Sequence, residues 1–162
     1  TRDTPTHRRW DVDVPPVVFA QPGDTVVAET DDFAAGQITR DSPASRLMEL
    51  DFDLIYPLAG PIHVEGAEPG DALAIEVLGF ELPDWGWSCI IPGFGLLPPG
   101  EFAEPVLRIF DLTEGDTTEL CPGVRIPVEP FCGTMGVPGP GMKDTPIPPP
   151  HAGGGKIGRA HV

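Results

Sequence analysis

A histidine and a glutamate stand two positions apart at His63 and Glu65, each beside an apolar residue. Ile62 and Val64 alternate with them, so this segment predicts a short β-strand with both polar side chains on one face. A carboxylate in such a place could bind a metal ion or take a proton from a water molecule. The alternative is that Glu65 caps a turn or accepts backbone hydrogen bonds, and the pattern favours neither.

Gly133 and Thr134 form a second candidate group, in a glycine-bounded segment. Glycine leaves backbone N–H groups unshielded, and such donors stabilise the negative charge that develops on a carbonyl oxygen during hydrolysis. Thr134 adds a hydroxyl group. The neighbouring Cys132 raises the alternative of a thiol nucleophile aided by a histidine. Tight turns and simple loop packing are the interpretations we favour for any single glycine and for this cysteine.

Short apolar or alternating runs recur between Pro, Gly and Asp residues, at 17–19, 25–29, 62–64, 72–78, 106–110 and 124–128. Many short strands joined by turns predict an all-β fold. A helical interpretation fails because few segments of ten or more residues lack Pro or Gly and show a 3.6-residue period. The best candidate for a helical turn or two is 44–50, with Ser42 as its cap and Pro43 at its first position.

Two of the predicted strands begin alike, after Pro-Gly-Asp at 22–24 and at 69–71. In each turn Pro presets φ, Gly supplies a positive φ, and the Asp side chain can accept hydrogen bonds from nearby backbone amides. We interpret this similarity as recurrent turn chemistry and not as evidence of a repeat protein. The expected fold is a two-sheet β-sandwich of jelly-roll type, with Pro- and Gly-rich loops and at most one or two short helices.

Composition limits the function classes. A chain of 162 residues with 40% hydrophobic content is long enough for one domain with a core. The net charge of -15 argues against nucleic-acid binding, which needs clustered Lys and Arg. No apolar run approaches the roughly 20 residues of a membrane-spanning helix. The three cysteines show no Cys-x-x-Cys spacing and predict a reduced, cytoplasmic protein.

The segment 60–71, Gly-Pro-Ile-His-Val-Glu-Gly-Ala-Glu-Pro-Gly-Asp, resembles the signature of the acetamidase/formamidase family. Members of that family hydrolyse small aliphatic amides to ammonia and a carboxylate. Further segments fall in the order that the family shows, at 15–16, 21–31, 85–87, 91–97 and 130–137. The resemblance runs from about Trp10 to Gly154, nearly the whole chain.

The resemblance implies metal-assisted attack of water on a small linear amide, with a divalent cation, zinc, as cofactor. Glu65 matches the family motif and is the expected ligand or general base. His63 stands where the family commonly has an aromatic residue, which favours a structural role. His151 lies next to a Gly-rich segment and is a second candidate metal ligand, although the family does not fix a histidine there.

The resemblance ends near Gly155. The family continues with Gly-Gly-Asn-Met-Asp, whereas this chain reads His-Ala-Gly-Gly-Gly-Lys at 151–156, and 157–162 match what a widely used sequencing adapter encodes. We expect residues 1–155 to be the N-terminal part of the sandwich domain and 156–162 to be a non-native tail. The family's later ligand-rich motif is absent, so the chain alone is expected to be an inactive fragment.

Two alternatives stay open. A non-catalytic β-sandwich binding module would show the same Pro-Gly-Asp turns and short strands. A sandwich that lacks part of its chain would also expose apolar edges, so pairing of copies into a homo-oligomer is left open.

Overall fold

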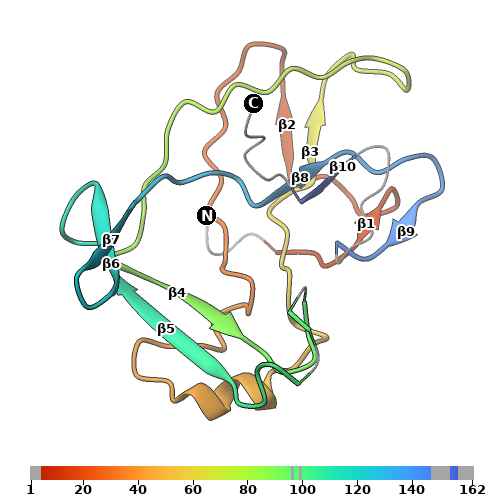
Figure 1. The fold of residues 1–162 in the computed structure, drawn as a ribbon. Helices are drawn as coiled ribbons and strands as arrows, with labels where there is room; N and C mark the ends of the chain where they lie inside the picture. The colour runs from red at the N-terminus through yellow and green to blue at the C-terminus, as the bar shows by residue number, and fades with distance from the viewer. Residues whose placement is uncertain (1–4, 96, 99, 147–153, 157–162) are drawn as a thin grey trace. The chain divides into compact units, whose positions relative to one another are not determined.

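The computed structural model describes residues 5–95, 97–98, 100–146 and 154–156 (Figure 1). Within these ranges the chain forms short strands and one 3-10 helix, and most residues lie in turns and coil. In chain order the elements are β1 (Trp10–Asp11), β2 (Val18–Ala20), η1 (Ala44–Glu49), β3 (Ile62–Val64), β4 (Trp85–Ile90), β5 (Val106–Asp111), β6 (Thr117–Cys121), β7 (Val124–Pro127), β8 (Thr134–Gly136), β9 (Lys143–Asp144) and β10 (Gly154–Lys156). The predicted all-β class is confirmed.

The described strands pair into five two-stranded sheets. Four pairs are antiparallel: β1 with β9, β8 with β10, β4 with β5, and β6 with β7. The fifth pair, β2 with β3, is parallel. Because no described ladder exceeds two strands, the jelly-roll sandwich stays a prediction.

The chain divides into two compact units. Unit 1 comprises residues 1–36, 52–78 and 132–162, and unit 2 comprises 37–51 and 79–131. Unit 1 therefore holds β1, β2, β3, β8, β9 and β10, whereas unit 2 holds η1 and the two antiparallel pairs β4–β5 and β6–β7. No described helix has the length and apolar character that crossing a membrane requires.

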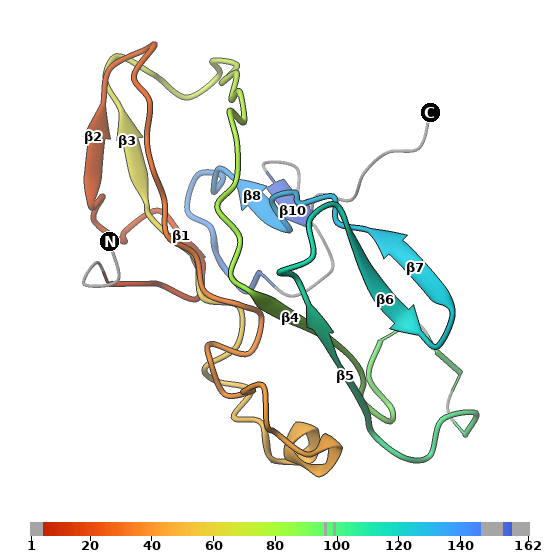
Figure 2. The same ribbon diagram turned by 90° about the vertical axis from the view of Figure 1, so that its left-hand side faces the viewer.

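The core of unit 2 lies where η1 contacts β5 (Figure 2). Leu47 of η1 is completely buried and Ile38 is nearly so. The Gln37 side chain links the two ends of the segment 37–51. Its amide nitrogen donates to the Asp51 carbonyl over 3.1 Å, and its amide oxygen accepts from the Asp51 N–H over 2.8 Å. The short helix is thus held by a buried side chain and by two hydrogen bonds beyond its end.

The predicted helix is confirmed in its position, but the predicted cap is wrong. The N-cap residue is Pro43, with φ -72° and ψ 157°, and no side chain caps the helix. The Ser42 hydroxyl instead accepts a hydrogen bond from the Thr39 N–H over 2.9 Å. The Ser42 N–H donates to the Thr39 carbonyl, which closes a turn before the helix starts. Ser42 is therefore used by that turn.

The two Pro-Gly-Asp turns of unit 1 form as predicted. Gly23 has φ 93° and Gly70 has φ 108°, a conformation that glycine adopts without strain. The Asp24 carboxylate accepts a hydrogen bond from the Gln21 N–H over 2.7 Å, and the Asp71 carboxylate accepts one from the Glu68 N–H over 2.9 Å. The recurrent turn chemistry expected from the sequence is thus confirmed in both places.

The strands expected after these turns do not form among the described residues. No described strand includes 25–29 or 72–78, and the residues of both are exposed. Both segments have the residue pattern of a strand, but a strand also needs a neighbouring strand to pair with. The pattern alone does not provide that partner. The expected strands at 17–19, 62–64, 106–110 and 124–128 are found within a residue or two of their predicted bounds. The longest strand that the pattern missed is β4, whose Trp-Gly-Trp start interrupts the apolar alternation.

Candidate functional site

The parallel pair β2–β3 carries the candidate site of unit 1. Its register places Val18 opposite Ile62, Phe19 opposite His63, and Ala20 opposite Val64. Two further hydrogen bonds extend the ladder at its ends: the Val17 N–H donates to the Pro61 carbonyl over 3.0 Å, and the Glu65 N–H donates to the Ala20 carbonyl over 2.9 Å. The ladder therefore fixes the backbone of Glu65, whereas the Glu65 side chain takes no part in the ladder.

His63 and Glu65 lie on the same face, as the sequence predicted. The His63 Nε2 atom is 3.9 Å from the Glu65 Oε2 atom, and the two side chains are 45% and 46% exposed. An exposed pair of this kind contributes about 0–1 kcal/mol to stability at most. The pair therefore contributes little to stability. The Glu65 carboxylate is accessible to a water molecule or a small solute.

Phe19 completes this face, and no sequence pattern pointed to it. The Phe19 and His63 rings have centroids 5.4 Å apart at an interplanar angle of 57°, and Phe19 is 66% exposed. The contact depends on the parallel register between two strands that are far apart in the chain, so only the fold could reveal it. We call Phe19, His63 and Glu65 the β2–β3 face.

Gly60 sets the start of strand β3. It is buried, its φ is +114°, and a Cβ atom there would lie 3.3 Å from the Ile62 nitrogen. We expect Gly60→Ala to destabilise the chain by about 1–3 kcal/mol. Alanine is strained at this positive φ, and its Cβ atom would lie in tight contact with the backbone. Urea unfolding measures the loss.

Gly79→Ala is the matched control for that substitution. Gly79 has no positive φ and nothing within 4 Å of its ideal Cβ position. This variant should be neutral or slightly stabilising, because alanine restricts the unfolded chain. Equal stability of the two variants would contradict the role assigned to Gly60.

The second group of predicted residues is not brought to the β2–β3 face. Gly133 precedes β8 and is exposed, and Thr134 is the half-buried first residue of β8, registered opposite Lys156 of β10. No hydrogen bond or ion pair joins Glu65 to either residue, and Figure 2 draws β8 apart from β3. Their proposed role as donors to an oxyanion stays a prediction. His151 lies outside the described residues.

The described residues do not complete a zinc site. Nowhere among them do three or more His, Cys, Asp or Glu side chains gather in a group that could hold a metal ion. The β2–β3 face offers two donors, His63 and Glu65, whereas a catalytic zinc takes three protein ligands and keeps a position for water. Further ligands would have to come from outside the described residues.

The cysteines give no support to a thiol nucleophile. Cys89, Cys121 and Cys132 are all free. Burial raises the pKa of the Cys89 thiol, so less of the reactive thiolate is present near neutral pH. Cys132 is half-buried, and its described surroundings include no hydrogen bond to a histidine. Packing remains the better interpretation for both.

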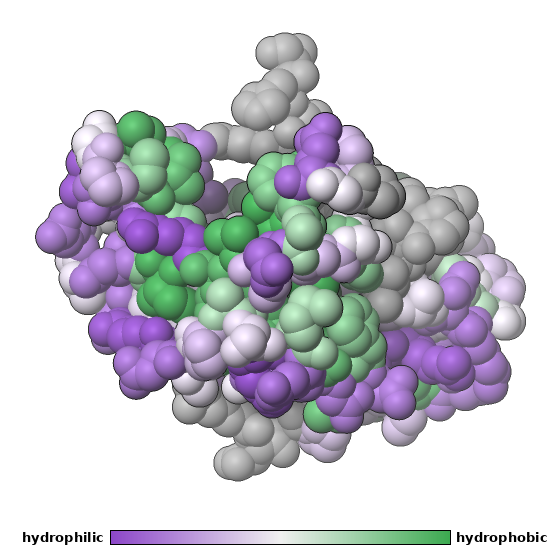
Figure 3. Space-filling view, turned by 60° about the horizontal axis from the view of Figure 1, so that its bottom comes forward, coloured by the Kyte–Doolittle hydropathy of each residue, from purple (hydrophilic) through white to green (hydrophobic). Residues whose placement is uncertain are grey.

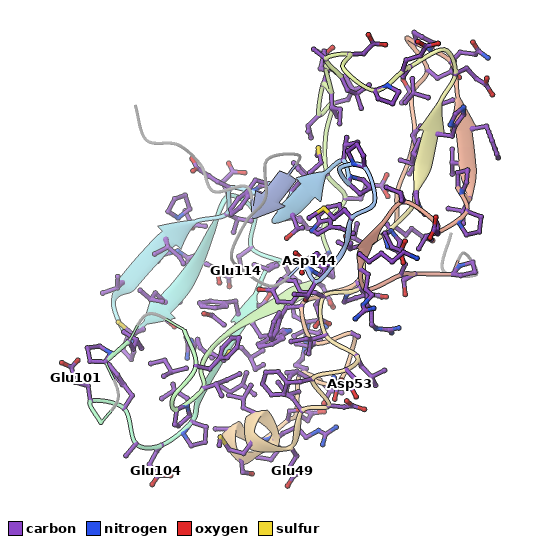
Figure 4. All side chains as sticks on the ribbon, turned by 90° about the vertical axis from the view of Figure 1, so that its right-hand side faces the viewer. Glu49, Asp53, Glu101, Glu104, Glu114 and Asp144 are labelled. Atoms are coloured by element: carbon purple, nitrogen blue, oxygen red, sulfur yellow. The ribbon has the colours of Figure 1, made fainter. Side chains whose placement is uncertain are left out.

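The acidity of the chain is dispersed. Figure 4 shows Glu49 of η1 and, on the loop before β5, Glu101 and Glu104 pointing outward and not toward one another. Glu49 is paired with Arg46 of the same helix, with 3.3 Å between Nη1 and Oε2. Spread in this way, negative charges keep a protein soluble and do not form a concentrated cation site.

Known proteins resemble nearly the whole of this chain. The profile of the Acetamidase/Formamidase family matches residues 1–145. A formamidase of Methylophilus methylotrophus is 36% identical over 90 residues, which cover 54% of this chain and 22% of the relative. An acetamidase of Mycolicibacterium smegmatis is 32% identical over 135 residues, which cover 75% of this chain and 33% of the relative.

Two solved structures resemble the chain as well. The crystal structure of an acetamidase from Bacillus halodurans superimposes with a TM-score of 0.84 at 34% identity, over 93% of this chain and 50% of that one. A gamma lactamase from Delftia acidovorans superimposes with a TM-score of 0.69 at 30% identity, over 83% of this chain and 35% of that one. The chain spans a third or less of these curated relatives and half or less of these solved chains. With a family match over most of its length, this chain belongs to the acetamidase/formamidase family.

Proposed function

We propose that this chain is part of a longer amidohydrolase that converts small linear amides of the formamide or acetamide class to ammonia and a carboxylate. The observation that carries the proposal is the match to a formamidase at 36% identity and to acetamidases at 32% and 34% identity. The segment around Glu65 is the strongest part of the family signature in the sequence. On this proposal the chain alone is inactive.

Glu65 is the residue we assign to general base catalysis. Its carboxylate takes a proton from a water molecule as the water oxygen bonds to the amide carbon. The tetrahedral intermediate then loses its C–N bond, and the same proton passes to the nitrogen, which leaves as ammonia. The 46% exposure of the Glu65 side chain supports this role, because a water molecule can reach it. Gly133 and Thr134 stay the proposed donors to the oxyanion.

A divalent cation, zinc, stays the proposed cofactor of the longer enzyme. When bound, zinc polarises a carbonyl group and lowers the pKa of a water molecule. Glu65 would supply a ligand only in place of its role as the base, and His151 is a further candidate ligand outside the described residues. Because the described residues provide no set of three ligands, the role assigned to Glu65 is that of a base and includes no step through the metal.

Composition supports the remaining functional proposals. Three free cysteines favour a reduced, cytoplasmic setting. A net charge of -15 leaves nucleic acid and anionic membrane surfaces as poor partners, and a small amide as the expected one. Assembly into a homo-oligomer stays open.

Ammonia release tests the proposal. The longer reading frame, recovered from the source DNA, and the 162-residue chain are each expressed and supplied with formamide and acetamide. We expect ammonia from the longer protein alone, its loss on treatment with a zinc chelator, and its return when zinc is added. A folded longer protein that hydrolyses no linear amide would favour the binding module. Full activity after metal removal would eliminate zinc and leave the amidase.

A further inference from the structure

Two apolar segments of unit 1 are expected strands, yet they belong to no strand in the part of the chain that the structure describes. In 72–78 the side chains of Leu73, Ile75 and Val77 recur at every second position and are each about half exposed, and Leu78, on the other side of the alternation, is 69% exposed. In 25–29, Val27 is 87% exposed. Figure 1 draws both segments as coil that follows β3 and β2 in the chain.

The backbone of 72–78 is as open as its side chains. No hydrogen bond joins it to another described segment. Leu73, Ile75 and Val77 make one face of this segment apolar, whereas the other face carries Glu76, a pattern typical of a strand that is covered on one face and paired along its edges. Contiguous exposed apolar surface marks a site of interaction, and unpaired backbone groups are a template for another strand. Figure 3 shows apolar surface on one face of the molecule, and the exposed fractions of Leu73, Ile75, Val77 and Leu78 assign such surface to 72–78 as well.

The second segment borders a small apolar groove beside strand β2. The groove has a volume of about 50 Å³, and its lining includes Val17, Val18, Val26, Val27, Ala28 and Ile62. Residues 26–28 therefore lie against the β2–β3 pair while their outer side stays open. A partner that covers them would lie close to the strands that carry the β2–β3 face.

The coverage of the relatives indicates which partner fits. This chain superimposes over 93% of its length on half of the Bacillus halodurans acetamidase, so that polypeptide carries as much chain again. A second copy is a poorer occupant, because each copy brings a net charge of -15 and copies repel one another. We propose that the other half of the family's polypeptide supplies a β-strand that pairs with 72–78 and apolar side chains that cover 25–29. This proposal rests on family membership and on the longer polypeptide proposed above, and not on amidase activity.

Hydrogen exchange followed by mass spectrometry tests the proposal in three proteins: the 162-residue chain, the complete Bacillus acetamidase, and a chimera in which this chain replaces the matched half of that enzyme. We expect amides of 72–78 to exchange on the order of 100-fold or more slowly in the chimera than in the chain alone. The aligned segment of the Bacillus enzyme should be equally slow. Fast exchange there overturns the proposal whether or not the chimera folds.

A pair of variants distinguishes strand pairing from a general gain in stability. Ile75→Lys should lower the Tm of the chimera by several degrees and leave that of the chain alone unchanged. Leu120→Lys is the matched control, since Leu120 is 42% exposed in the β6–β7 pair, and it should leave both unchanged. Equal effects of the two variants, or protection of 72–78 in the chain alone that rises with its concentration, would overturn the proposal. The second result would assign the surface to another copy.

Discussion

Replacing Glu65 with glutamine in the longer enzyme is expected to lower kcat for formamide or acetamide by about 100- to 10,000-fold, the usual contribution of a positioned general base. Glutamine has nearly the same size but cannot accept the proton from water. The hydrogen bond from the Glu65 N–H to the Ala20 carbonyl belongs to the backbone and persists in the variant. The loss should therefore appear in steady-state kinetics without a change in the circular dichroism spectrum.

Glu68→Gln is the matched control for this experiment. Glu68 lies three residues further along, in the Pro-Gly-Asp turn, where its backbone N–H and not its carboxylate makes the hydrogen bond to Asp71. We expect activity within about twofold of the unmodified enzyme, because surface substitutions of this kind have small effects. Near-normal turnover by Glu65→Gln would remove Glu65 from the mechanism and leave the family assignment in place.

The turns and the short helix could be predicted well, because they depend on residues that are close together in the sequence. The Pro-Gly-Asp turns need only a glycine with positive φ and a carboxylate three positions from an amide, and both turns form as expected. The helix at 44–49 was found in the same way. Its cap was not, since Ser42 can serve either the helix or the preceding turn, and the pattern does not say which.

Pairing was harder to predict, because it joins residues that are distant in the chain. Alternation at 72–78 predicted a strand, but only a partner makes one, and the described residues offer none. The same limit applies to the candidate site. A period of two placed His63 and Glu65 on one face, whereas Phe19 reaches that face only through the parallel register of β2 and β3.

Leu47→Ala is expected to cost about 2–5 kcal/mol of the free energy of unfolding, the range for removing a fully buried leucine side chain. Leu47 is the buried residue of the short helix, with none of its surface exposed. A 3-10 helix of six residues has little stability of its own, so it depends on this contact with the rest of unit 2. Urea unfolding followed by tryptophan fluorescence, to which Trp85 and Trp87 of the same unit and Trp10 of unit 1 contribute, measures the loss.

Met48→Ala separates packing from helix propensity. Met48 is the next residue of the same helix and is 56% exposed, and its change to alanine alters the intrinsic helix preference about as little as the change at Leu47 does. We therefore expect Met48→Ala to stay within about 0.5 kcal/mol of the unmodified chain. A similar loss in both variants would contradict the assignment of the loss to the burial of Leu47. A loss confined to Leu47→Ala would show that one apolar side chain anchors it.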